Sequence, residues 1–151
     1  MPHINDKYDF VISVYIVYKG QVLLVNHPRY KLWVPMGGHI ELDEDPEQAL
    51  YREIEEETGL TGIEILSSRP SIDQRGTKFL PTPNYMDVHE ANPPHKHICM
   101  VYFARAKNKN HRLSDEHIAI EWLGLEDLDK PVYSLENAVK FYCQEAIKVA
   151  Q

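Results

Sequence analysis

The segment from Asp45 to Gly59 constrains this chain more than any other, because it carries the signals for both ends of a helix. Asp45 suits the N-cap, Pro46 suits the first helical position, and Gln48 completes a capping-box pattern three residues after Asp45. Gly59 suits the left-handed residue that ends many helices. The sequence therefore predicts a helix over Asp45–Thr58.

One face of this predicted helix is acidic. At about 100° per residue, Glu53, Glu56 and Glu57 share an arc of about 100°, the width of one helix face. Five glutamates oppose one arginine over Pro46–Thr58, a net charge of −4. Three of these acids lie at 55–57, near the C-terminal end, where the helix dipole disfavours negative charge.

Bound divalent cations would offset this repulsion, and hard carboxylate oxygens suit Mg²⁺ or Mn²⁺. The pattern leaves two other interpretations open. The face can be a solvated acidic surface that binds nothing, or it can dock a basic partner protein.

Apolar runs on either side of this helix predict strands. Phe10–Tyr18 and Gln21–Asn26 read as a hairpin around the turn signal Lys19-Gly20, and His97–Ala106 reads as a buried strand. Shorter elements are also predicted: strands around Leu32–Val34, Ile63–Leu66 and Ile118–Trp122, a helical turn over Leu123–Asp129, and a helix over Ser134–Lys148 with Ser134 as its N-cap.

The segment Ser67–Lys96 differs from the rest, because it holds five prolines and lacks a helical period. A connection this long is usually functional or disordered. We therefore expect it to be a loop.

Length and charge limit the class of protein. A chain of 151 residues suits one domain over 1–151. Its net charge of −7 and pI of about 5.6 argue against binding nucleic acid or acidic membranes. We expect neither a signal peptide nor a membrane span, and hence a cytoplasmic protein by default. Two cysteines make no disulfide framework.

The residues from Gly38 onward read GHIELDEDPEQALYREIEEETGL. This stretch resembles the Nudix box, G-x5-E-x7-R-E-U-x-E-E-x-G-U, in which U is a bulky aliphatic residue. A chance match somewhere in the chain is on the order of one in ten million. Every fixed position matches: Gly38, Glu44, Arg52, Glu53, Ile54, Glu56, Glu57, Gly59 and Leu60.

The resemblance implies a fold and an activity. The fold would be an α/β Nudix fold, an α/β/α sandwich around a mixed β-sheet in a single domain. The activity would be Mg²⁺-dependent hydrolysis of a nucleoside diphosphate linked to another group, which yields a nucleoside monophosphate and a phosphorylated remainder. Nucleotide substrates are the expected partners.

The resemblance also implies roles for the matching residues. Glu53, Glu56 and Glu57 would ligate one or more Mg²⁺ (or Mn²⁺) ions, and the carbonyl of Gly38 would be a further ligand. Arg52 would orient Glu56, and Glu44 would brace the preceding loop and help at the metal. Some family members supply another carboxylate near the position of Glu116; an exposed loop acid is the alternative.

The substrate is less constrained than the reaction. Modest size favours a nucleoside triphosphate, including an oxidised deoxynucleotide, over an ADP-sugar or a dinucleoside polyphosphate. Positions 75–78 lack the proline and the tyrosine that tend to mark the latter two classes. Four residues are candidate substrate contacts, with ordinary packing or solvent exposure as the alternative for each: His39, Tyr85, His95 and His97.

Other functions remain open. A binding module that has kept the fold and lost catalysis is disfavoured by the intact Arg-Glu-x-x-Glu-Glu pattern. Isoprenoid-diphosphate isomerisation needs a positioned cysteine, and neither Cys99 in a strand nor Cys143 in a helix is placed for it. The sequence leaves open the oligomeric state, a homodimer included, the number of metal ions and the general base.

Overall fold

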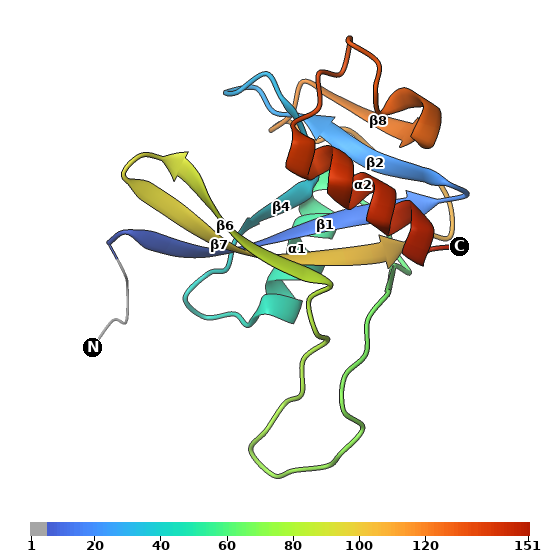
Figure 1. The fold of residues 1–151 in the computed structure, drawn as a ribbon. Coiled ribbons are helices and arrows are strands. Elements are labelled where there is room, and N and C mark those ends of the chain that lie inside the picture. Colours follow the sequence, from blue (N-terminus) through green and yellow to red (C-terminus); the bar gives the residue numbers. More distant parts are fainter. Residues whose placement is uncertain (1–5) are drawn as a thin grey trace.

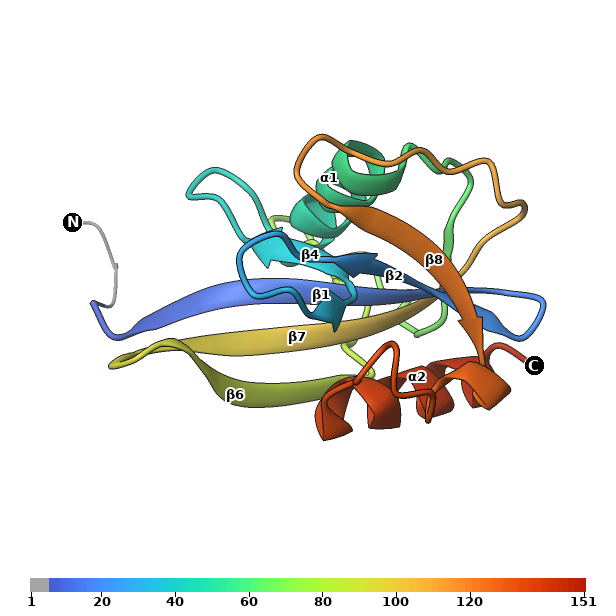
Figure 2. The same cartoon turned by 90° about the horizontal axis from the view of Figure 1, so that it is seen from above.

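A computed structural model describes residues 6–151, which form a mixed eight-stranded sheet with a helix on each face. Figure 1 shows the elements in sequence colours, and Figure 2 shows α1 and α2 on opposite sides of the sheet. In chain order they are β1 (Tyr8–Tyr18), β2 (Gln21–Asn26), β3 (Trp33–Val34), β4 (Met36–His39), α1 (Pro46–Thr58), β5 (Glu64–Ile65), β6 (Tyr85–Asn92), β7 (His95–Arg105), β8 (Ala119–Gly124), the 3-10 turn η1 (Leu125–Asp127) and α2 (Asn137–Val149).

The sheet is built around β1. This strand pairs antiparallel with β2 and β4, and parallel with β7. β8 extends the sheet beyond β2, while β5 and β6 pair antiparallel with β7. A parallel pair needs a long crossover, and here the chain between β1 and β7 includes α1 and the long loop drawn in green in Figure 1. The predicted mixed sheet in an α/β/α sandwich is confirmed.

The core lies in two layers, one under each helix. β1 contributes to both, because Ile12, Val14 and Ile16 pack on the α1 side while Val11, Tyr15 and Val17 pack on the α2 side. A strand buried on both faces reads as a continuous apolar run, which explains why β1 was visible in the sequence. In the described residues no helix has the length and apolar character needed to cross a membrane.

The predicted helix caps of α1 are confirmed. The Asp45 carboxylate accepts a hydrogen bond of 2.9 Å from the backbone N–H of Gln48, and the Gln48 side chain accepts one of 2.8 Å from the N–H of Asp45. Gly59 adopts a left-handed φ of 68° at the other end. The ends of α1 are therefore set by local chemistry.

One prediction about the middle of the chain was wrong, and one short strand was not predicted. The segment Ser67–Lys96 is not one continuous loop, because β6 occupies Tyr85–Asn92 and β7 begins at His95. Most β6 side chains are exposed, so the strand carries no apolar alternation that would have marked it. The short strand β4 was also missed; its glycines pair with Ile12 and Ser13 of β1.

The predicted start of the last helix was also wrong. α2 begins at Asn137, with Glu136 in the N-cap position and no side-chain cap hydrogen bond. Ser134 instead has a left-handed φ of 45°, and its hydroxyl donates a 2.6 Å hydrogen bond to the carbonyl of Pro131. The Ser134 hydroxyl therefore stabilises a local turn and does not cap α2.

Candidate functional site

Arg52 is the centre of the acidic face of α1. Its Nε and Nη2 donate to the carboxylate of Glu44, at 3.0 and 2.5 Å. Its Nη1 donates to Glu53 at 2.8 Å and to Glu56 at 3.2 Å. Its Nη2 also donates to the backbone carbonyl of His39 at 3.0 Å. One guanidinium therefore holds three glutamates and joins α1 to the end of β4.

Glu53 and Glu57 are buried where α1 meets β4. Glu57 accepts a 2.9 Å hydrogen bond from the backbone N–H of Gly37, and the two carboxyl groups are hydrogen-bonded to each other. A Cβ on Gly38 would lie 2.3 Å from Oε1 of Glu53. A glycine is therefore required at position 38 for this carboxylate to reach the strand.

Burial dominates the electrostatics of this pair. Removal from water raises the pKa of Glu57 to about 9, and the nearby negative charges of Glu53 and Glu116 add to the effect. Burial also raises the pKa of Glu53, against the opposing hydrogen bonds from Glu57 and Arg52. By contrast, the hydrogen bonds from Arg52 lower the pKa of Glu44. The positive charge of Arg52 therefore stabilises the ionised form of Glu44, whereas burial disfavours the ionised forms of Glu53 and Glu57.

This arrangement fits a divalent cation. Glu53 and Glu57 place two buried carboxylates side by side with their pKa values raised, and carboxylate oxygens are the hard donors that Mg²⁺ prefers. Glu53, Glu56 and Glu57 can supply these oxygens. The side chain of Glu56 is 55% exposed and faces solvent.

The loop before β8 closes over this site. Nε2 of His117 lies 3.1 Å from Oε2 of Glu57, and only 7% of the His117 side chain is exposed. Burial lowers the pKa of this imidazole. Glu116, next to it, is exposed and close enough to act on the charge of Glu57. The sequence indicated Glu116 as a candidate but not His117, because the contact between His117 and Glu57 depends on how the loop before β8 packs against α1.

A cavity of about 760 Å³ opens on the α2 side of the sheet. It meets the acidic face at the strand β4, since Gly37, Gly38 and His39 all line it. His27 and Tyr30 also line it, and their ring centroids lie 4.9 Å apart. The acidic face and the cavity thus meet at β4, which lines the cavity and also contacts Glu53 and Glu57.

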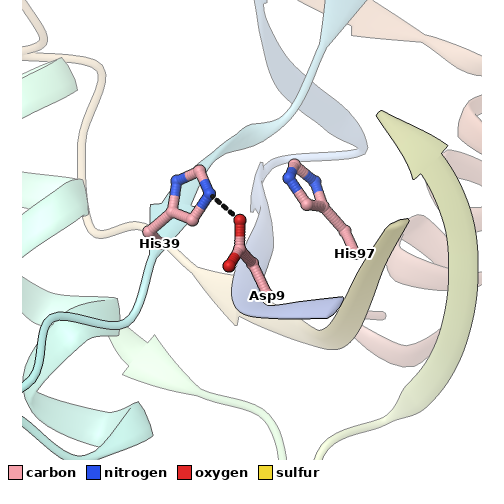
Figure 3. Close-up of side chains that lie close together, drawn as sticks. All are labelled: Asp9, His39 and His97. Atoms are coloured by element: carbon pink, nitrogen blue, oxygen red, sulfur yellow. Dashed lines mark hydrogen bonds and ion pairs between the residues drawn. The ribbon is translucent and has the colours of Figure 1, made fainter. Parts of the chain in front are cut away.

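The predicted substrate contacts separate into two groups. His39 and His97 line the cavity, and Figure 3 shows both rings directed toward Asp9. His95 binds the same carboxylate of Asp9 from outside the cavity lining. Tyr85 packs instead against Phe103 and α2, and it does not line the cavity.

The comparison with known families agrees with this geometry. A NUDIX domain matches residues 7–143, which is most of the chain. The chain belongs to the Nudix hydrolase family.

Solved relatives share the whole fold. A hydrolase of the NUDIX family from Clostridium perfringens is 32% identical, with a TM-score of 0.84 over 95% of this chain and 98% of that chain. The MutT NUDIX hydrolase from Burkholderia pseudomallei is 25% identical, with a TM-score of 0.64 over 97% of this chain and 100% of that chain.

Among curated proteins, the NAD-capped RNA hydrolase NudC from Photobacterium profundum is 31% identical over 99 residues. That match covers 63% of this chain and 37% of the length of NudC. The chain is thus comparable to less than half of this curated relative.

Proposed function

We propose that this chain is an Mg²⁺-dependent pyrophosphohydrolase that acts on a nucleoside diphosphate linked to another group. A nucleoside triphosphate, including an oxidised deoxynucleotide, is the favoured substrate. The observation that carries the proposal is the buried, hydrogen-bonded pair Glu53–Glu57, placed against Gly38 at the edge of the cavity.

The residues divide the work. Glu53, Glu56 and Glu57 would hold the metal with the Gly38 carbonyl, and Glu116 would add a carboxylate from the loop before β8. A bound Mg²⁺ would neutralise phosphate oxygens and lower the pKa of the attacking water. Arg52 and Glu44 keep the carboxylates in position through the hydrogen bonds described above.

The cavity supports a nucleotide as the ligand. Its volume of about 760 Å³ lies within the range of small-molecule sites. The aromatic ring of Tyr30 offers a stacking surface, and the guanidinium of Arg29 lies 5.4 Å from that ring. His39 and His97 also line the cavity and would lie near the phosphate groups of a bound nucleotide. Base and phosphates would therefore lie along the cavity, with the anhydride at β4.

A substrate panel tests this proposal. Nucleoside triphosphates, oxidised deoxynucleotides, ADP-ribose, nucleotide sugars, dinucleoside polyphosphates and NAD are incubated with and without Mg²⁺, and the products are separated by anion-exchange chromatography. NAD is included because the curated relative is named for NAD-capped RNA. We expect Mg²⁺-dependent release of a nucleoside monophosphate, fastest from a triphosphate. A panel without any Mg²⁺-dependent product would refute the enzymatic function.

Two variants of α1 test the site itself. Glu57→Gln keeps the shape of the buried side chain and removes its charge, and we expect kcat to fall by at least about 100-fold. Glu55→Gln is the matched control, because Glu55 is exposed on the same helix and outside the contacts of Arg52 described above. A Glu57→Gln protein as active as Glu55→Gln would show that the carboxylates have been assigned wrongly.

A further inference from the structure

Strand register places three metal-ligating side chains together at one end of the sheet. Asp9 of β1 is the register partner of His97 on β7. Val11, two residues further along β1, is the partner of His39 on β4. Residues two apart on a strand share a face, so the three side chains project from the same side of three adjacent strands.

The side chains converge in space. Nε2 of His39 lies 3.1 Å from Oδ2 of Asp9. One ligand atom from each of Asp9, His39 and His97 can be chosen so that all three lie within 4.8 Å of one another. Figure 3 shows the carboxylate of Asp9 between the two imidazole rings, which come from strands on either side of β1.

This cluster is separate from the carboxylates of α1. Gly38 faces Glu53, because a Cβ there would touch that side chain. His39 is the next residue on the strand, so its side chain points to the opposite face. That face is the α2 side, where Val11 and Cys99 also lie. The strand β4 therefore stands between the two clusters.

We propose that Asp9, His39 and His97 form a second metal site, for a divalent transition-metal ion such as Zn²⁺, on the face of the sheet opposite the Nudix carboxylates. Imidazole nitrogens favour Zn²⁺ and its neighbours, whereas Mg²⁺ favours oxygen ligands. Two histidines with one carboxylate are also a known ligand set for zinc.

The site needs little rearrangement. Ligand atoms about 2.1 Å from a tetrahedral ion lie roughly 3.4 Å apart. Because the three atoms already lie within 4.8 Å of one another, side-chain movements of roughly 1.4 Å or less would bring them to ligand spacing. His95 binds the carboxylate of Asp9 from the side, in the way that outer partners hold metal-binding carboxylates in orientation.

The open side of the site faces the cavity. His39 and His97 both line it, whereas Asp9 does not. Three protein ligands with an open position are typical of zinc sites that bind water or a ligand, and purely structural sites use four. The bound ion would therefore present its free position to an anionic group in the cavity.

Metal binding can be measured without hydrolysis. Protein freed of metal with a chelator is placed in excess Mg²⁺, to fill the site proposed on α1, and is titrated with Zn²⁺ by calorimetry. Co²⁺ replaces Zn²⁺ in a parallel titration, read by its visible absorption. We expect one equivalent of Zn²⁺ to bind, with an affinity at least about 100-fold lower in His97→Ala and in Asp9→Asn, and about 10-fold lower in His95→Gln.

Two control variants separate this site from the α1 carboxylates and from histidines elsewhere on the molecule. Glu57→Gln should bind Zn²⁺ as tightly as the unmodified protein, because the α1 carboxylates lie on the other face. His111→Ala removes a histidine that accepts a hydrogen bond from Trp122, at the other end of the molecule, and should also leave binding unchanged. Circular dichroism identifies variants that have not folded. If His97→Ala does not fold, the Zn²⁺ affinity of Asp9→Asn tests the proposal in its place.

Zn²⁺ binding that is equal in Asp9→Asn and the unmodified protein would overturn the proposal, as would the absence of Zn²⁺ binding in excess Mg²⁺. Loss of binding in Glu57→Gln alone would also overturn it, since the ion would then belong to α1. Because the readout is metal binding, none of these results bears on the hydrolysis proposed above.

Discussion

Gly38 leaves the space that the carboxylate of Glu53 fills, and this contact gives the first prediction. In Gly38→Ala the new Cβ would lie 2.3 Å from Oε1 of Glu53 and 2.8 Å from its Cδ. Arg52 and Glu57 both hold this carboxylate, so it cannot turn away without losing partners. We expect the free energy of unfolding to fall by about 1–3 kcal/mol, measured by urea denaturation, with Mg²⁺-dependent activity lost.

Gly124→Ala is the matched control for this substitution. Its Cβ would lie 2.6 Å from Oε1 of Glu126, which is also closer than a Cβ can normally approach. Glu126 is exposed, however, and can move into solvent. We expect a change below about 0.5 kcal/mol. Equal losses in the two variants would show that the space beside Glu53 is not special.

Arg52→Lys tests whether the geometry of the guanidinium matters beyond its charge. Arginine donates here to Glu44, Glu53 and Glu56 together, and a lysine ammonium lacks the planar fork that makes this possible. We expect the affinity for Mg²⁺, measured by calorimetry, to fall by about 10- to 100-fold while the protein remains folded. An unchanged affinity for Mg²⁺ would show that only the positive charge of Arg52 matters, and not the geometry of its guanidinium.

Among the elements, α1 depends on its N-cap. Asp45→Ala removes the hydrogen bond to the N–H of Gln48, and we expect a loss of about 0.5–2 kcal/mol in thermal or urea unfolding. Ser134→Ala is the comparison, because Ser134 lies outside α2 and its hydroxyl bonds to Pro131. A larger loss of stability in Ser134→Ala than in Asp45→Ala would show that the N-cap of α1 is not the more important of the two side-chain contacts.

Glu47 ties the first turn of α1 to the long loop before β6. Its buried carboxylate binds Arg69 and lies 3.3 Å from Nζ of Lys78. These contacts, led by the hydrogen bond from Arg69, lower the pKa of Glu47 below the ordinary 4.5. A lowered pKa means that the stabilisation is present above pH 4.5 and is lost as the pH falls through the folded-state value.

We therefore expect the loop at 69–84 to become more accessible to hydrogen exchange and to acid-stable proteases as the pH drops below about 4.5. In Glu47→Gln the loop should be equally accessible at neutral pH and in acid, because the charge is absent at both. A loop that opens in acid to the same extent in this variant would assign the effect to other carboxylates.

Local signals explain which elements the sequence predicted. The caps of α1 are Asp45 and Gly59, the residues directly before and after the helix, and β1, β2 and β7 are marked by apolar runs. β6 has mostly exposed side chains and depends on pairing with β7. No local pattern marks such a strand, so a prediction from sequence alone extends the loop through it.

The same reasoning applies to the sites. The carboxylates of α1 lie within five residues of one another, and helical geometry alone predicts their common face. The cluster of Asp9, His39 and His97 depends on the register of three strands from distant parts of the chain. The alternation of His95 and His97 can be read from the sequence, but their proximity to Asp9 on β1 cannot.

At the scale of the whole molecule, both core layers use the same central strand. Leu50 on α1 and Ile147 on α2 are buried against opposite faces of the sheet. Because β1 contributes to both layers, we expect Leu50→Ala and Ile147→Ala each to destabilise the protein by about 2–5 kcal/mol and to keep a single unfolding transition. Fluorescence and circular dichroism should give coincident urea curves. Separate transitions would divide the chain into two units.

The parallel pairing of β1 with β7 has a consequence for how the protein is made. The register joins Tyr8 to Lys96 and Val17 to Arg105, so each pair spans 88 positions of chain. Contacts between such distant residues form slowly, because the intervening chain must first be brought together. During synthesis, α1 with its carboxylates leaves the ribosome well before β7 exists. Until β7 arrives, one edge of β1 stays unpaired, so the nascent chain is vulnerable to aggregation at that edge.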